Sequence, residues 1–92
     1  MTVVSPVTTA VQVRYFAGAR AAAGVAEEDL LLDTAEPTVA LVVSTIADRH
    51  GDRLGKVLAA SSFLLDGVAV RDTSVRVPAG SQLDVLPPFA GG

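Results

Sequence analysis

The chain has 92 residues, 50% of them hydrophobic, with a net charge of −3 and no cysteine. This length fits one small domain, the lack of any basic run argues against nucleic-acid partners, and the lack of cysteine excludes disulfides, thiolate zinc sites and cysteine nucleophiles. The sequence shows neither a signal peptide nor an apolar run long enough to cross a bilayer, so we expect a cytoplasmic protein without membrane partners.

The first predicted element is a strand, and the fold is expected to begin near Ala10. In the segment VQVRYF, Val11, Val13 and Tyr15 alternate with residues that would face the other way, which is the period of a strand. Residues 1–9 are rich in Thr, Val and Ser, and we interpret them as a flexible N-terminal extension. The glycine- and alanine-rich segment after the strand is predicted as a connection with a short helical turn.

A second strand and a helix follow. Residues 29–32 form a short apolar run that predicts a strand. Residues 39–50 predict a helix, because apolar residues recur there at i, i+3, i+4 and i+7, namely Val39, Val42, Val43 and Ile46. Thr38 is placed to cap the first turn and Gly51 to end the helix. Residues 52–61 are compatible with either a short helical turn or a loop.

Two apolar runs in the C-terminal third are joined by Asp66 and Gly67. An Asp-Gly pair in this position is a hairpin signal, because a type I′ turn needs positive φ at both residues. We therefore expect a hairpin whose strands are residues 62–65 and 68–71.

The last predicted strand contains Leu83 and Val85, which alternate with polar neighbours. Several strands around one strong helix indicate an α+β fold in which a mixed sheet packs on one main helix. If the first and last strands pair side by side and in parallel, the fold is a β-grasp, the ubiquitin-like architecture. The domain would then span residues 10–86, followed by a flexible tail at 87–92.

The remaining polar residues indicate no catalytic or metal centre. His50 is the lone histidine and is assigned a role at the helix end. The acidic run 27–29 is interpreted as a charged edge before a strand. Lys56 is interpreted as a solvated side chain, with an interface or ligation role as the alternative. No serine has a recognisable histidine and acid partner, so we expect no bound metal or cofactor and no catalysis by the chain alone.

The chain ends in LPPFAGG, and this ending is the strongest functional signal. Glycine has no Cβ, so Gly91 and Gly92 can enter a narrow channel and present an unobstructed terminal carboxylate. With an ordinary pKa of about 3.3–3.7, a terminal carboxylate is ionised near neutral pH and inert as an electrophile, so another enzyme must activate it. Pro87 and Pro88 stiffen the exit from the last strand.

Apolar residues in the tail and on the domain form the predicted partner-binding set. Phe89 and Ala90 would contact a partner as the tail enters it. On the domain, Phe16 and Phe63 are predicted members of an exposed apolar patch. The full set is Pro87, Pro88, Phe89, Ala90, Gly91, Phe16 and Phe63.

The segments VRYFAGARAAAG, ADRHG, LDGVAV and PAGSQLDVLPPFAGG together resemble the molybdopterin synthase small subunit, the MoaD-type sulfur carriers of the MoaD/ThiS family. The resemblance covers roughly residues 11–92 and implies that a MoeB-like adenylating enzyme uses ATP and Mg²⁺ to adenylate Gly92. A thiocarboxylate would then replace the adenylate. It also implies that the tail enters a MoaE-like large subunit and gives its sulfur to cyclic pyranopterin monophosphate. The absence of cysteine agrees, since Gly92 would hold the sulfur.

Three other functions stay open. The same tail would serve a sulfur carrier for thiamine-thiazole or cysteine synthesis, although the Pro-Pro pair favours the molybdopterin branch. It would also serve a ubiquitin-like modifier that joins Gly92 to lysines of target proteins. In a plain interaction module, the terminal carboxylate would be chemically unused. The choice of acceptor lies with the partner, so the sequence does not separate these functions.

Overall fold

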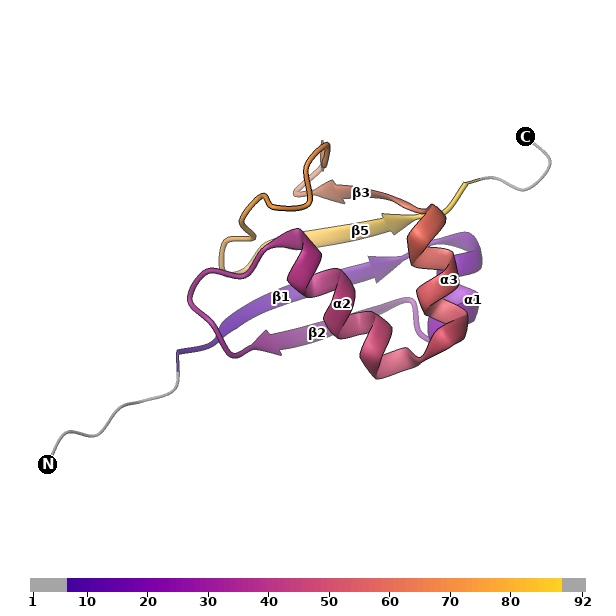
Figure 1. Ribbon diagram of the computed structural model, residues 1–92, viewed down its shortest axis with the longest axis horizontal. Helices are drawn as coiled ribbons and strands as arrows, with labels where there is room; N and C mark the ends of the chain where they lie inside the picture. The colour runs from indigo at the N-terminus through magenta and orange to yellow at the C-terminus, as the bar shows by residue number, and fades with distance from the viewer. Residues whose placement is uncertain (1–6, 89–92) are drawn as a thin grey trace, which may run out of the picture.

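The computed structural model describes residues 7–88, so residues 1–6 of the predicted extension and 89–92 of the predicted tail lie outside it. Its elements are, in chain order, β1 (Thr9–Tyr15), α1 (Ala17–Ala23), β2 (Glu27–Leu32), α2 (Val39–His50), α3 (Asp52–Ala60), β3 (Ser62–Leu65), β4 (Val68–Ala69) and β5 (Gln82–Leu86). The strands form one sheet in the order β2-β1-β5-β3-β4, and α2 and α3 lie across one of its faces (Figure 1).

The first and last strands lie side by side at the centre of the sheet. β1 pairs with β5 in parallel, with Tyr15 opposite Val85. The pairs β1–β2, β3–β5 and β3–β4 are antiparallel. A mixed sheet with this central parallel pair, covered by helices on one face, is a β-grasp, and the predicted fold class is confirmed.

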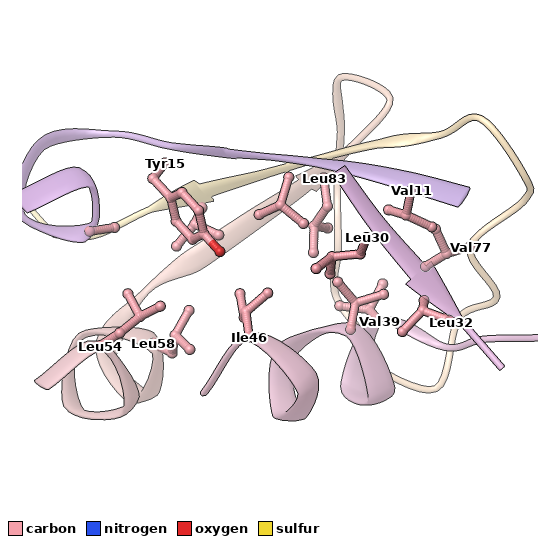
Figure 2. Packing of buried hydrophobic residues seen from close by; sticks show 14 residues of the cluster. Val11, Tyr15, Leu30, Leu32, Val39, Ile46, Leu54, Leu58, Val77 and Leu83 are labelled. Atoms are coloured by element: carbon pink, nitrogen blue, oxygen red, sulfur yellow. The ribbon is translucent and has the colours of Figure 1, made fainter. Parts of the chain in front are cut away.

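Alternation along the strands directs one set of side chains into the core between the sheet and the helices (Figure 2). In the two central strands this set is at most 2% exposed and consists of Val11, Val13, Tyr15, Leu83 and Val85. The helices pack against this set with buried aliphatic residues at helical spacing, which are Val39, Val42, Ile46, Leu54 and Leu58. Small branched side chains therefore build most of the core.

The helix predicted over residues 39–50 is present with both of its caps. The Thr38 hydroxyl accepts a hydrogen bond from the Leu41 N–H at 3.1 Å, and Gly51 ends α2 with a φ of 89°. The undecided stretch after it is α3, whose Leu54 and Leu58 lie one turn apart and are both buried. The sheet is therefore covered by two helices rather than by one main helix alone.

Three strand boundaries differ from the predicted ones. β1 begins at Thr9, and β2 begins at Glu27 because its ladder with β1 continues to the pair Arg14–Glu27. The hairpin turn has positive φ at Asp66 and Gly67, as predicted. However, β4 holds only Val68–Ala69 rather than residues 68–71, because the chain leaves the sheet there for the loop before β5.

The last turn of α2 is attached to the sheet through Glu28 of β2. The Glu28 carboxylate accepts a hydrogen bond from the Tyr15 hydroxyl at 2.7 Å and one from the Arg49 guanidinium at 2.7 Å. The His50 Nε2 contacts the same carboxylate, and the His50 ring meets the edge of the Tyr15 ring with centroids 5.8 Å apart. The Glu28 side chain is only 13% exposed.

This Glu28 cluster corrects one interpretation from the sequence and adds a contact to another. The run 27–29 is not a charged edge before a strand, because it lies within β2 and Glu28 faces the helices. His50 does lie at a helix end as predicted, yet its acidic neighbour is 22 residues away in the chain and invisible to local spacing.

The protonation states in the Glu28 cluster follow from its contacts. Burial by itself would raise the pKa of Glu28, but hydrogen bonds from Tyr15, Arg49 and His50 outweigh burial and lower that pKa. Burial, followed by the hydrogen bond to Glu28, raises the pKa of Tyr15. Glu28 is therefore ionised and Tyr15 neutral at neutral pH. In these states Tyr15 joins β1 to Glu28 of β2, and Arg49 and His50 attach α2 to the same carboxylate.

We expect Glu28→Gln to lower the free energy of unfolding by about 2 kcal/mol near pH 7, because charge-assisted hydrogen bonds to a buried carboxylate are lost. The pKa of Glu28 is depressed in the folded state, so its contribution is complete above the unfolded pKa of about 4.3 and is lost as the pH falls through the lower folded value. Urea denaturation followed by circular dichroism should show the difference between wild type and variant shrinking below about pH 4.

Glu36→Gln is the matched control. Glu36 pairs with Arg76 at 2.7 Å, but both side chains are largely exposed, at 60% and 69%. Exposed pairs of this kind contribute little to stability, so the control should change the free energy of unfolding by less than about 0.5 kcal/mol. Equal losses in the two variants, or a Glu28→Gln loss that is unaffected by acid, would contradict the assignment.

Candidate functional site

The tail leaves the domain from the most buried strand of the sheet. β5 lies between β1 and β3, and its three central residues, Leu83, Asp84 and Val85, are all buried. β5 ends at Leu86, opposite Ser62, the first residue of β3. Figure 1 shows that this exit lies at the end of the molecule where α3 also ends. The base of the tail is therefore held on both sides by neighbouring strands.

Two prolines follow β5 directly. Pro87 is half-buried and Pro88 is exposed, and neither belongs to the sheet. Proline has no N–H to donate to a ladder, so the pairing of β5 stops where the prolines begin. Phe89, Ala90, Gly91 and Gly92, the other predicted tail residues, lie outside the described residues, and their roles stay predictions.

A salt bridge crosses the two central strands on the face that the helices leave open. The Arg14 guanidinium donates to the two Asp84 carboxylate oxygens at 2.8 and 2.9 Å. Asp84 is only 6% exposed, and burying an unpaired carboxylate would be costly, so the two-pronged contact with Arg14 explains how β5 tolerates it. The same guanidinium lies 5.4 Å from the centre of the Phe16 ring.

Apolar side chains surround the tail base on this open face. Phe16 follows β1, is 38% exposed, and its N–H donates to the Val85 carbonyl at 3.2 Å, which places Phe16 beside Leu86. Leu64 pairs with Asp84 across the β3–β5 ladder and so faces the same way. We call Phe16, Leu64, Leu86 and Pro87 the tail-root patch. Pro87 directly follows β5, so the tail-root patch includes the base of the tail.

Phe63 does not join Phe16 in one patch. It pairs with the core-facing Val85, packs partly buried against the core, and lines a groove between α2 and α3 with Ala47 and Leu58. Phe16 and Phe63 therefore lie on opposite faces of the sheet, and the partner-binding role of each stays a prediction. The sequence did not reveal that Leu86 lies beside Phe16 or that Leu64 faces the same way, because the first depends on the parallel register of β1 with β5 and the second on the antiparallel register of β3 with β5.

The described residues contain neither a metal-binding cluster nor a membrane-spanning helix. Within residues 7–88, no group of three or more His, Asp or Glu residues is arranged to hold a metal ion. No helix in this part of the chain is long and apolar enough to cross a membrane.

Solved structures with the same fold include proteins of two kinds. The putative molybdopterin converting factor, subunit 1, from Pyrococcus furiosus is 26% identical, with a TM-score of 0.78 over 88% of this chain and 99% of that one. Small archaeal modifier protein 1 from Methanosarcina acetivorans is 22% identical, with a TM-score of 0.76 over 92% and 98%. A complex of subunits 1 and 2 of the molybdopterin-converting factor from Helicobacter pylori 26695 matches at 19% identity, with a TM-score of 0.62 over 91% and 100%.

No curated protein matches the chain. The model of the ThiS family, however, matches residues 13–92, a segment that runs from the middle of β1 through β5 to the terminal glycines. The match spans most of the chain and includes the second half of β1, all of β5 and the C-terminal residues. The chain therefore belongs to the ThiS family.

Proposed function

We propose that the chain is a sulfur carrier that acts as the small subunit of molybdopterin synthase, with the sulfur held as a thiocarboxylate on Gly92. The observation that supports this most is that the ThiS family match extends through residue 92 and so includes the Gly-Gly end. The structure adds that the tail begins directly after a central, buried strand. A rigid base and a side-chain-free end suit a group that must reach into another protein's active site.

The chemistry requires two steps at the terminal carboxylate. The carboxylate attacks ATP, forming an acyl-adenylate and releasing pyrophosphate, with Mg²⁺ supplied by the activating enzyme. A sulfur nucleophile then attacks the acyl carbon and displaces AMP, which leaves a thiocarboxylate. The chain contributes the acyl group and its presentation, while a MoeB-like adenylating enzyme supplies the catalytic groups. Because ATP is consumed, we place the reaction in the cytoplasm.

The partner that receives the sulfur would be a MoaE-like large subunit. Two structural matches support this choice, since one is named subunit 1 of a molybdopterin converting factor and another is a complex of subunits 1 and 2. The tail-root patch offers such a partner an apolar surface at the base of the tail. In this proposal cyclic pyranopterin monophosphate accepts the sulfur inside the large subunit.

A second candidate function is protein modification. It is favoured by the match to small archaeal modifier protein 1, whose TM-score of 0.76 is close to the 0.78 of the converting-factor subunit. The same acyl-adenylate would then react with a lysine amine rather than with a sulfur nucleophile. Thiamine-thiazole and cysteine synthesis remain further acceptor pathways for the sulfur. The acceptors are distinguished by product, namely a dithiolene, a thiazole, cysteine or a conjugate of higher mass.

Deletion of Gly92 should abolish sulfur transfer without unfolding the domain, because Gly92 follows β5 by six residues and the core of the described part is built from residues between Val11 and Val85. Dithiolene formation in a reconstituted synthase should fall to background, while the thermal melt stays within about 2 °C of wild type, the shift expected when no core contact changes. The truncated chain keeps the tail-root patch and should still bind the large subunit. Retained transfer by the truncated chain, or its unfolding, would refute the proposed role of the tail.

Phe16→Asp should weaken binding to the large subunit at least tenfold, because a charge would be buried in the apolar contact. The fold should survive, since Phe16 is the N-cap of α1, makes no side-chain cap hydrogen bond, and Asp is a favoured N-cap residue. Leu31→Asp is the matched control: Leu31 is 72% exposed on the edge strand β2, away from the tail. Calorimetric affinities that fall equally for both variants, or for neither, would show that the tail-root patch is not the contact.

A further inference from the structure

Lys56 is the only lysine in the chain, and it is exposed on α3. The other basic side chains apart from His50 are arginines, whose guanidinium groups stay protonated and are not acylated under ordinary conditions. An activated acyl group at Gly92 therefore has two amines of its own chain to react with, the Lys56 side chain and the α-amino group.

The surroundings of Lys56 leave room for a glycine tail. Lys56 lines a shallow recess where α2 meets α3, and the other residues of this recess are small or acidic: Ala47, Asp48, Gly51, Asp52, Gly55 and Ala59. A Cβ built on Gly51 or Gly55 would meet no atom within 4 Å, so this side of the recess is open. The two terminal glycines can approach the Lys56 amine across these small residues more closely than they could across bulky ones.

The tail begins close enough for its end to reach this amine. Leu86 is the cross-strand neighbour of Ser62, and Ser62 follows α3 after one residue. Four residues of helix from Lys56 to Ala60, two extended steps to Ser62 and one cross-strand step to Leu86 together span at most about 18 Å. The six residues from Pro87 to Gly92 can extend about 20 Å, and a lysine side chain reaches further still.

We propose that Lys56 is an acylation site for the tail of its own chain, so that an activated Gly92 forms an intramolecular amide with the Lys56 amine. The inference rests on the proposed activation of Gly92. Capture within one molecule is favoured because a short tether gives an effective concentration of the order of millimolar, far above a micromolar protein concentration.

The step balances as an ordinary aminolysis. The neutral Lys56 amine attacks the acyl carbon of the Gly92 adenylate, the C–N bond forms, the bond to AMP breaks, and one proton passes to water or buffer. The product is a closed loop from residue 56 to residue 92 that has no terminal carboxylate and takes up no sulfur. Lys56 would thus limit the lifetime of an activated carrier whose tail is not held by a partner.

The test uses the full chain with a thioester at Gly92, prepared by intein cleavage, so that no activating enzyme is needed. Dilute protein at about pH 8 is followed by intact mass spectrometry and peptide mapping. Wild type should yield a species about 18 Da lighter than the free acid. Its first-order rate constant should not change with protein concentration, as expected for reaction within one molecule. Its peptide map should join the segment containing Lys56 to the C-terminal segment.

Two variants control the result. Lys56→Arg keeps the charge and the α-amino group, and it should form the lighter species at least tenfold more slowly. The double variant Lys56→Arg, Arg76→Lys moves the amine to an exposed position at the other end of the sheet. The backbone there is held by hydrogen bonds from the Val77 N–H to the Pro37 carbonyl and from the Gly80 N–H to the Ala10 carbonyl at the start of β1. The double variant should behave like the single variant.

Three outcomes would overturn the proposal. The first is hydrolysis of wild type to the free acid alone, and the second is equal loop formation in Lys56→Arg. The third is a product dominated by covalent dimers whose yield rises with concentration. Because the thioester bypasses adenylation, each outcome is independent of whether a partner enzyme thiocarboxylates Gly92, so failure here is distinguishable from failure of the proposed function.

Discussion

The parallel pairing of β1 with β5 is the constraint on which the rest of the structure depends. It makes the last strand of the chain a central strand of the sheet, held by β1 on one side and β3 on the other. The chain therefore ends a few residues after one of the most buried parts of the domain. The residues after β5 therefore start from a fixed point, which in the proposed function lowers the entropic cost of binding the tail.

The same pairing sets what lies around the tail. It brings Arg14 beside Asp84 and Phe16 beside Leu86, which gives the open face an ion pair to the buried Asp84 and an apolar border at the exit. On the opposite face, the Glu28 cluster holds the end of α2 against β1 and β2. Because α3 follows α2 after Gly51 alone, this attachment also helps to position α3, whose C-terminal end lies near the tail base.

Local signals were sufficient for the elements that depend on local interactions. The helix 39–50 could be predicted because its apolar spacing, its Thr38 cap and its Gly51 end all act within a few residues. The Asp66–Gly67 turn was predictable for the same reason. By contrast, α3 contains Gly55 and has modest intrinsic preference for a helix, so its formation depends on the burial of Leu54 and Leu58 against the rest of the domain.

The contacts that the sequence did not reveal are those set by pairing between distant segments. The parallel pairing itself could be stated only as a condition, because nothing in either strand specifies its neighbour. The contact of Glu28 with His50 and the separation of Phe16 from Phe63 both follow from strand register, and a shift of one residue would reverse every face. The Gly-Gly end was recognisable at once because its chemistry depends on residue type and position in the chain rather than on folding.

The central claim is that the sulfur is held at Gly92, and the most direct measurement is the intact mass of the chain after incubation with ATP, Mg²⁺, a sulfur donor and its adenylating partner. The account predicts a gain of about 16 Da, the exchange of one oxygen for sulfur at an activated acyl group, located in the C-terminal peptide. An unchanged mass in the presence of a partner shown to be active on another carrier, or a gain located elsewhere in the chain, would contradict it.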